Sequence, residues 1–364
     1  MMNQIKVLFI LNDLGGGGAE KVFIHIANGF KSQGIEVEML LAENQGVYFD
    51  LVDPAIPLHI LGAKSFLGIL RKLPSFLKRR KYTHVFTAFD YISAATIIAN
   101  RRLKHKFVTI TTLHYNLPYQ LSILPWANRI WLQYLNKYII AKADKLVCVS
   151  NGVGQGFKEV AQKSDLQIQT IYNPVVESAI FNFAKEEIEN DYSSMDYLIT
   201  IGRLNDQKNQ KSLLYAFQLV LQEKPKLHLL ILGAGPKEIE LKNTCKDLAI
   251  QHNVHFLGFQ SNPFKYLVRA KLFVLSSDYE GLGNVIIEAL ALGINVVSTD
   301  CPSGPSEILV NNKYGWLSEM KNPVDLAKKI KMALEHPKLP SFLQERSKLF
   351  ETNRIVMQYL TLLD

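Results

Sequence analysis

Short apolar runs alternate with helix-spaced apolar residues along this 364-residue chain, and that alternation limits its fold more than any other feature. Runs rich in Val, Ile and Leu occupy 5–11, 36–42, 84–89, 107–114 and 145–150, and a second series occupies 197–204, 227–235, 254–259, 272–277 and 294–300. A strand that is apolar along its whole length is typical of a parallel sheet with both faces covered by helices. The chain is therefore predicted to be α/β, with two doubly wound domains.

The two series meet near 173–196, where the segment AKEEIENDYSSMD is acidic, polar and without apolar periodicity. Such a composition is typical of a linker between domains. We expect an N-terminal domain of residues 1–176 and a C-terminal domain of residues 177–344. The last segment, about 345–364, has the pattern of one amphipathic helix or two.

The net charge of +8 comes from one part of the chain, because residues 61–110 carry eleven Lys or Arg and a single acid, Asp90. Apolar residues interleave with the basic ones, which suits an anionic lipid surface, although a pair of solvated helices remains the alternative. No helix-turn-helix, zinc-finger or RNA-platform signature accompanies the charge, which argues against nucleic acid as a partner. The predicted membrane patch consists of Arg71, Lys72, Lys78, Arg79, Arg80 and Lys81.

The sequence contains no secretory signal pattern and no run of about 20 apolar residues, so we expect neither secretion nor a membrane span. Its three cysteines, Cys148, Cys245 and Cys301, lie far apart and have no metal-ligand or redox spacing. This fits a reducing cytoplasm, and no metal site is predicted.

Four glycines, Gly15 to Gly18, separate a predicted strand from a predicted helix. Backbone N–H groups approach an anion closely at such a turn, and the helix N-terminus favours negative charge, so the loop is a candidate phosphate site. A loop that is only flexible or tightly packed is the alternative. A dinucleotide fingerprint would need Gly or Ala where Glu20 and Lys21 stand, and no P-loop sequence occurs.

Two cations, Arg203 and Lys208, follow the predicted strand at 197–201 in the segment GRLNDQKN. Ligands bind beyond the carboxyl ends of strands in open α/β sheets, and two cations there can neutralise a diphosphate. Guanidinium gives directional hydrogen bonds and ammonium acts as a mobile point charge. A pair of solvated surface charges is the alternative.

The segment EGLGNVIIEALALG, residues 280–293, places Glu280 on a predicted loop and Glu288 on a predicted helix that Asn284 opens as N-cap. Backbone N–H groups around 283–285 form a second candidate anion site. A carboxylate only accepts hydrogen bonds, so Glu288 can bind a vicinal diol such as ribose, and Glu280 a group beyond the phosphates. A diol, a diphosphate and a further hydroxyl-rich group describe a nucleotide sugar.

The segments GGGGAEK, GRLNDQKN, LGAGP, VHFLGF and SSDYEGLGNVIIEALALGINVVST occur in an order that resembles the retaining glycosyltransferases of family four, which have the GT-B fold. The resemblance covers nearly the whole chain, and its most specific element is the pair Glu280 and Glu288. It implies two Rossmann-like domains with a cleft between them, the first for the acceptor and the second for the nucleotide-sugar donor. It also implies that the helix at about 345–364 packs back on the first domain.

The resemblance implies a role for each motif. In the family, the position of Glu280 contacts the donor sugar, that of Glu288 holds the ribose, and the glycine loop closes on the diphosphate. The implied catalytic residues are Glu280, His114, Arg203 and Lys208. The implied donor-binding residues are Gly16, Gly17, Gly18, Arg203, Lys208, Gly258, Phe259, Glu280, Gly281, Leu282, Gly283, Asn284, Val285 and Glu288.

The family's reaction keeps the anomeric configuration and releases a nucleoside diphosphate, so preorganised donors must stabilise charge on the leaving group. No Asp-x-Asp occurs, and cations and helix dipoles can replace a divalent metal, so we expect no metal cofactor. The resemblance implies a UDP-linked hexose or N-acetylhexosamine as the donor.

The acceptor implied by DCPSGPSEIL, residues 300–309, is a glycan linked to undecaprenyl diphosphate or a lipopolysaccharide core, as in bacterial relatives with this segment. Together with the basic segment and the aromatic stretch at 117–140, it predicts an enzyme bound peripherally to the cytoplasmic membrane face. For the aromatic stretch, a buried helix of the first domain is the alternative.

Two other functions remain open at this point. One is a GT-B-fold epimerase that converts the UDP-sugar without an acceptor. The other is a catalytically silent subunit that binds the nucleotide sugar within a glycan assembly complex.

Overall fold

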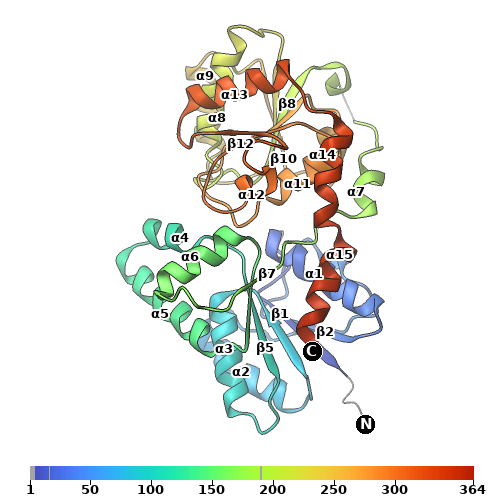
Figure 1. The fold of residues 1–364 in the computed structure, drawn as a ribbon, viewed down its shortest axis with the longest axis vertical. Helices are drawn as coiled ribbons and strands as arrows, with labels where there is room; N and C mark the ends of the chain where they lie inside the picture. The colour runs from blue at the N-terminus through green and yellow to red at the C-terminus, as the bar shows by residue number, and fades with distance from the viewer. Residues whose placement is uncertain (1–4, 16, 189–190) are drawn as a thin grey trace. The chain divides into compact units, whose positions relative to one another are not determined.

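The computed structural model describes residues 5–15, 17–188 and 191–364, and its ribbon is shown in Figure 1. The chain folds into two compact units, Met1–Pro174 with Thr352–Asp364, and Val175–Glu351. It leaves the first unit after Pro174 and re-enters it at Thr352, where the sequence suggested 176 and about 345. Each unit is built on its own parallel sheet.

The sheet of the first unit has seven parallel strands in the order β3-β2-β1-β4-β5-β6-β7. Strand order reverses between β1 and β4, which makes this position the topological switch point of the sheet. The strands are β1 Lys6–Leu11, β2 Glu36–Leu41, β3 Leu58–Ile60, β4 His84–Thr87, β5 Val108–Leu113, β6 Lys145–Cys148 and β7 Gln169–Thr170.

Helices cover both faces of this sheet. Alternate residues of β1 take part in two different cores: Phe9 packs with α1 and α15, and Ile10 packs with α2 and α3. Figure 1 shows α15, at the end of the chain, lying beside α1. The helices of this unit are α1 Gly18–Ser32, α2 Phe66–Lys78, α3 Asp90–Arg102, α4 Leu117–Ile123, α5 Trp126–Lys142, α6 Asn151–Ala161 and α15 Thr352–Leu360, with 3-10 turns η1 Phe49–Leu51 and η4 Thr361–Leu363.

The sheet of the second unit repeats the pattern with six parallel strands in the order β10-β9-β8-β11-β12-β13. Its switch point lies between β8 and β11. The strands are β8 Tyr197–Ile201, β9 His228–Leu232, β10 Val254–Gly258, β11 Leu272–Leu275, β12 Val296–Thr299 and β13 Trp316–Ser318. The helices are α7 Ser178–Phe183, α8 Gln210–Leu221, α9 Glu238–Asp247, α10 Phe264–Leu267, α11 Asn284–Ala291, α12 Pro305–Leu309, α13 Pro323–Glu335 and α14 Pro340–Ser347, with 3-10 turns η2 Asp191–Ser194 and η3 Lys348–Phe350.

These two sheets confirm the predicted α/β class with two doubly wound domains. The segment near 173–196 is more ordered than a linker, because it contains α7, whose Phe183 ring stacks on Phe264 with centroids 6.5 Å apart. Among the described residues, no helix is both long enough and apolar enough to cross a bilayer.

Backbone contacts tie together the loops that follow β8, β9 and β10. Gly202 N donates to Leu232 O at 2.9 Å, and Gly233 N donates to Gly258 O at 2.7 Å. Gly233 has φ 135°, and a Cβ on it would overlap the carbonyl oxygen of Gly202. Glycine at 233 therefore lets the β9 loop lie directly against the β8 loop, which carries Lys208.

We expect Gly233→Ala to destabilise the second unit by roughly 3 kcal/mol, because its Cβ meets backbone that has no room to shift. The matched control is Gly34→Ala, at φ 81° with open space around the new methyl group. It should cost only about 1 kcal/mol, for the left-handed backbone alone. Thermal unfolding of both variants measures the difference, and equal shifts would show that the loop contact is not tight.

Candidate functional site

In each unit, most predicted site residues follow a strand at the switch point or a strand next to it. In the first unit, residues 12–15 follow β1, which adjoins the switch point, and His114 follows β5, one strand further along the sheet. In the second unit, loop 202–209 follows β8, and loop 276–283 follows β11. Ligands bind beyond the carboxyl ends of strands at a switch point of an open sheet. Each unit thus carries its polar motifs at the sheet edge where its fold favours binding.

An ion pair between Lys208 and Glu280 joins the two loops of the second unit. Lys208 Nζ lies 2.6 Å from Glu280 Oε1, and the Ser277 hydroxyl donates to the same oxygen at 2.6 Å. The side chains of Lys208 and Glu280 are 18% and 8% exposed. Little water screens a pair buried this deeply, so it holds the ammonium group in one position.

Further hydrogen bonds reinforce this junction of loops. Asn209 Nδ2 donates to Asp278 Oδ1 at 2.8 Å, and Gln207 Nε2 donates to Tyr279 O at 3.0 Å. The backbone N–H of Asp278 donates in return to Gln207 O at 2.8 Å. The β8 and β11 loops are therefore one rigid assembly rather than two mobile segments.

Arg203 differs from Lys208 although the two share a loop. Its side chain is exposed, and in the described part of the chain its guanidinium group makes no hydrogen bond or ion pair. A guanidinium without a protein partner is available for two directional hydrogen bonds to an anion. The loop thus presents one fixed cation and one adaptable cation.

The two glutamates of the segment at 280–293 lie on the elements expected for them, Glu280 on the β11 loop and Glu288 within α11. The predicted N-cap, Asn284, is wrong by one residue, because α11 begins at Asn284 and its N-cap is Gly283. Gly283 has φ 94°, a left-handed conformation that glycine adopts without strain. A Cβ on Gly304 would overlap the carbonyl oxygen of Leu282, so a second glycine permits close packing behind this loop.

The end of β10 carries two of the implied donor-binding residues, Gly258 and Phe259. Gly258 has φ 68° with open space beside its Cα, and the ring of Phe259 is 62% exposed. Gly258 O accepts from Gly233 N, which links this strand end to the loop junction described above.

The glycine loop of the first unit carries acids as well as backbone donors. Gly16 lies outside the described residues; Gly17 is the N-cap of α1, and Gly18 is its first residue. The Gly15 N–H donates to Asp13 Oδ1 at 2.7 Å. The carboxylate of Glu20 lies beside Gly17, so a Cβ at 17 would meet it. The protein's own carboxylates therefore lie near the helix N-terminus where the sequence predicted a phosphate.

His114 is held neutral at the end of β5. Burial lowers the pKa of His114 to about 4. Its Nε2 lies 2.8 Å from the Thr112 hydroxyl, which donates its own proton to Thr87 O at 3.2 Å. With the Thr112 proton directed to Thr87 O, Nε2 carries the imidazole proton and Nδ1 keeps a lone pair. That lone pair can accept a hydrogen bond from a ligand hydroxyl.

Sequence reasoning missed a half-buried acid that is hydrogen-bonded to the residue after His114. Asp90 is the first residue of α3, and its Oδ2 accepts a hydrogen bond of 2.5 Å from the hydroxyl of Tyr115. Burial raises the pKa of Asp90 to about 6, although hydrogen bonds from Tyr115 and Asn136 lower it. The available signal was a single acid just after an apolar strand, in an otherwise basic segment.

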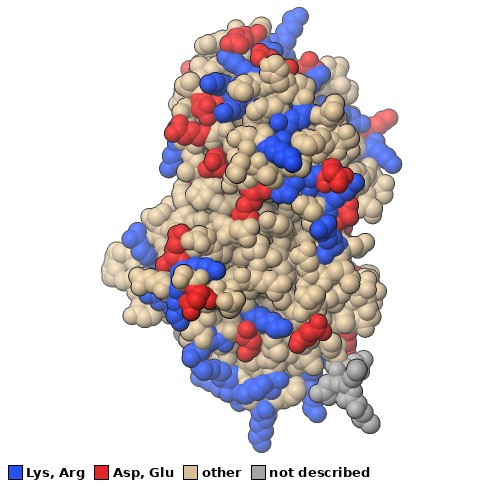
Figure 2. Space-filling view, viewed as in Figure 1, with Lys and Arg blue, Asp and Glu red and all other residues tan. Residues whose placement is uncertain are grey.

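Two members of the predicted basic patch contact other groups of the protein. Arg80 Nε lies 3.6 Å from Glu38 Oε2, and Lys72 Nζ donates to Gly62 O at 2.5 Å. Because α2 starts from a strand's carboxyl end, its last turn and residues 78–81 lie toward the opposite edge of the sheet. Figure 2 shows Lys and Arg gathered over α2 and α3. Of the predicted patch, the exposed members are Arg71, Lys72, Lys78, Arg79 and Lys81.

An apolar surface lies at the beginning of α5, which we call the aromatic patch: Trp126, Ile130, Trp131 and Tyr134 are 76%, 47%, 53% and 71% exposed. The Trp131 ring contacts Phe66 of α2, with centroids 5.6 Å apart. The opposite face of α5, with Leu135 and Ile139, is buried. A fully buried helix, the alternative left open above, is therefore wrong for the outer face of α5.

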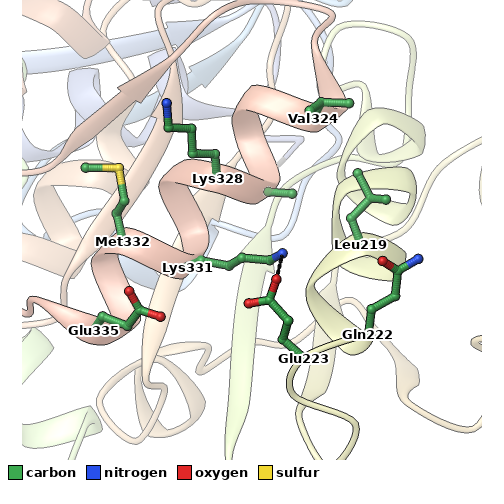
Figure 3. Close-up of a pocket in the computed structure, with 9 residues that line it drawn as sticks. Leu219, Gln222, Glu223, Val324, Lys328, Lys331, Met332 and Glu335 are labelled. Atoms are coloured by element: carbon green, nitrogen blue, oxygen red, sulfur yellow. Dashed lines mark hydrogen bonds and ion pairs between the residues drawn. The ribbon is translucent and has the colours of Figure 1, made fainter.

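Figure 3 shows a shallow groove of about 450 Å³ between α8 and α13 of the second unit, crossed by an ion pair of 2.5 Å from Lys331 to Glu223. None of the predicted site residues lines it. Its lining residues are Leu219, Gln222, Glu223, Val324, Ala327, Lys328, Lys331, Met332 and Glu335.

Groups of three or more metal-ligating side chains are not found among the described residues. The cysteines Cys148, Cys245 and Cys301 are buried and unpaired with one another. Burial raises the pKa of the Cys245 thiol to about 11, so this group stays protonated and unreactive at neutral pH.

Comparison with protein families matches both units. Residues 16–178 match the family described as Glycosyltransferase Family 4, and residues 182–350 match the one described as Glycosyl transferases group 1. The two matches together span nearly the whole chain and fall on the two units in turn.

Two similar curated proteins come from Campylobacter jejuni. One, the N-acetylgalactosamine-N,N'-diacetylbacillosaminyl-diphospho-undecaprenol 4-alpha-N-acetylgalactosaminyltransferase, is 28% identical over 94% of both chains. The other, the GalNAc-alpha-(1->4)-GalNAc-alpha-(1->3)-diNAcBac-PP-undecaprenol alpha-1,4-N-acetyl-D-galactosaminyltransferase, is 26% identical over 99% of this chain and 98% of its own. Among solved structures, HepE of Anabaena in complex with UDP has a TM-score of 0.80 and 20% identity over 99% of both chains, which confirms the predicted GT-B fold.

Lys208→Met should lower the free energy of unfolding by about 3 kcal/mol, because it leaves the buried carboxylate of Glu280 without its cation. The double variant Lys208→Met/Glu280→Gln should recover most of that loss, since the Ser277 hydroxyl still bonds to a neutral side chain at 280. Urea unfolding followed by circular dichroism compares the two. If the double variant is no more stable than the single one, the pair does not contribute as its geometry indicates.

Proposed function

This chain belongs to the glycosyltransferases of family 4, and from that membership we propose that it moves a hexose or N-acetylhexosamine from a UDP-linked donor to a lipid-linked or lipopolysaccharide glycan. The observation that carries the proposal is the buried Lys208–Glu280 pair at the switch point of the second sheet. The two Campylobacter relatives, whose names specify undecaprenol-linked acceptors, support this class of acceptor.

The donor is bound by the second unit in this proposal. Lys208 and Arg203 neutralise its diphosphate, and Glu288 on α11 accepts from the ribose hydroxyls. Glu280 accepts from the transferred sugar while it holds Lys208 in place. An N-acetylhexosamine is the donor sugar that both relatives' names indicate, and UDP is the nucleotide bound in HepE.

The chemistry we propose is electrostatic. Negative charge grows on the leaving diphosphate as the glycosidic bond breaks, and a cation already fixed in position stabilises that charge without reorganising. Lys208 meets this condition because Glu280 orients it in the free protein. Together with Arg203 and the N-terminus of α11, Lys208 supplies the positive field that a divalent metal supplies in other enzymes, so we propose that the reaction needs no metal. We also propose that the reaction keeps the anomeric configuration.

We further propose that the protein binds the cytoplasmic face of the membrane peripherally through the aromatic patch of α5. Trp and Tyr favour the interfacial region of a bilayer, where one end of the side chain is apolar and the other is wet. The exposed cations of α2 add long-range attraction to anionic lipid. The aromatic patch lies at the start of α5, toward the same edge of the first sheet as His114.

We predict that the purified protein releases nucleoside diphosphate in EDTA when one UDP-sugar is supplied with an undecaprenyl-diphosphate-linked glycan. A panel of UDP-sugars and GDP-mannose identifies the donor. Glu280→Ala and Lys208→Ala should lower release by at least about 100-fold, because each removes a charged hydrogen-bonding partner of the donor. Lys237→Ala, which breaks an exposed ion pair with Asp206, is the matched control and should keep wild-type activity.

Loss of release on chelation, restored by Mg²⁺ or Mn²⁺, would overturn the metal-free part of the proposal. An isomeric sugar nucleotide formed from the donor alone would point to the epimerase. Tight donor binding with no turnover across the panel would point to a silent binding subunit.

A separate prediction concerns binding to the membrane. Trp126→Ala/Trp131→Ala should weaken co-sedimentation with phosphatidylglycerol vesicles about tenfold or more, because the variant loses two large interfacial side chains. The triple variant Lys78→Ser/Arg79→Ser/Lys81→Ser should weaken binding less, and mainly at low salt. It removes only the electrostatic attraction to anionic lipid, which salt screens. Wild-type binding by the aromatic variant would show that the membrane contact lies elsewhere.

A further inference from the structure

A half-buried carboxylate in the first unit, Asp90, has no role in the function proposed above. It lies at the N-terminus of α3, three residues after the end of β4, and β4 adjoins the switch point of the first sheet. The neighbouring residue Tyr91 donates its hydroxyl to Asn12 Oδ1 at 2.7 Å, which ties this helix start to the loop after β1. Asp90 is thus at the edge where this sheet favours a ligand.

Side chains that follow β5 and lie on α5 form hydrogen bonds at Asp90. The hydroxyl of Tyr115, next to His114 in the chain, donates to Asp90 Oδ2 at 2.5 Å. Asn136 of α5 is fully buried, and its Nδ2 donates to the Tyr115 oxygen at 3.3 Å. Asn136 also hydrogen-bonds to Asp90 itself. A carboxylate can accept about four hydrogen bonds, so Tyr115 and Asn136 leave acceptor capacity on Asp90.

The charge environment of Asp90 is unusual for a structural residue. Within the described residues, no Lys, Arg or His pairs with it, and burial raises its pKa to about 6. Burying a carboxylate without a cation is costly, and a neutral amide would serve a structural role at lower cost. A carboxylate kept under these conditions at a ligand-binding edge is a candidate for substrate binding.

The polar side chains of the first unit at this edge of the sheet are matched to hydroxyl groups rather than to phosphate. The lone pair of His114 Nδ1 and the carboxylates of Asp13 and Asp90 all accept hydrogen bonds, and the carboxylates repel anions. The cations predicted to bind diphosphate, Arg203 and Lys208, are in the other unit. A sugar, which is rich in O–H donors and uncharged, fits the first unit's edge; a second diphosphate does not.

We propose that Asp90 binds the glycan acceptor, by accepting hydrogen bonds from hydroxyl groups of its terminal sugar, with Tyr115 as the positioning residue that orients the carboxylate. This inference rests on the proposed transferase function and goes beyond it, because it names the acceptor's recognition element. Asp90 selects acceptors whose terminal sugar offers two adjacent hydroxyl donors, a geometry that one carboxylate group can satisfy.

The test is steady-state kinetics of wild type, Asp90→Ala, Asp90→Asn and Tyr115→Phe with the donor and lipid-linked acceptor that support transfer. Asp90→Ala should raise the acceptor KM about 10- to 100-fold, the usual effect of losing hydrogen bonds to a charged group. The donor KM and the UDP affinity should stay within about twofold of wild type. Asp90→Asn, which keeps one carbonyl acceptor, and Tyr115→Phe, which frees the carboxylate to turn, should give smaller increases.

The matched control is Asp144→Asn. Asp144 also holds a hydrogen-bonded carboxylate in the first unit, bound to the Thr109 hydroxyl at 2.7 Å near the start of β5, at the opposite edge of the sheet. It should leave the acceptor KM unchanged. Thermal unfolding and UDP binding check that each variant is folded; if Asp90→Ala does not fold, Asp90→Asn and Tyr115→Phe decide the question.

Two results would overturn the inference. One is an acceptor KM that is unchanged in the Asp90 and Tyr115 variants although the wild type transfers. The other is a parallel rise of donor and acceptor KM, which a purely structural role predicts. Failure of the proposed function looks different, because the wild type itself would then transfer to none of the acceptors tested, and the inference would fall with it.

Discussion

The burial of both faces of two parallel sheets is the constraint on which the rest of this structure depends. Successive residues of β1, such as Phe9 and Ile10, point into different cores, so neither face leaves a place for functional polar groups. Most polar side chains must then lie in the loops beyond the strand ends. At the carboxyl edge, helices begin and strand order reverses, so polar groups from several loops converge there.

Periodicity in the sequence was sufficient to predict most of this architecture. The run at 5–11 became β1, and the motif at 280–293 has Glu280 on a loop and Glu288 within α11. The strands β3, β7 and β13 were missed because they have only two or three residues, too few to show a pattern. Apolar alternation carries information over a few residues at a time, which is the length scale of strands and helix turns.

Periodicity in the sequence could not predict interactions between distant residues. Lys208 and Glu280 are 72 residues apart, and neither residue's neighbours indicate that they pair. The same is true of Asp90 and Tyr115, which meet only because β4 and β5 are adjacent. For the aromatic stretch that contains α5, the sequence left a lipid-facing surface and a buried helix both open, since a helical apolar pattern does not tell whether protein, lipid or water covers each side. Local pattern therefore predicts which loops carry chemistry, and three-dimensional structure decides which groups act together.

The return of the chain from the second unit to the first has a consequence for biosynthesis. Ile355, Val356 and Tyr359 of α15 belong to the core of the first unit, against α1. The ribosome makes these residues only after it has made the whole of the second unit. The first unit therefore remains incomplete, with apolar surface on α1 uncovered, while the second unit is being translated. Folding of the two units is consequently not sequential from N- to C-terminus: the unit begun first is completed last.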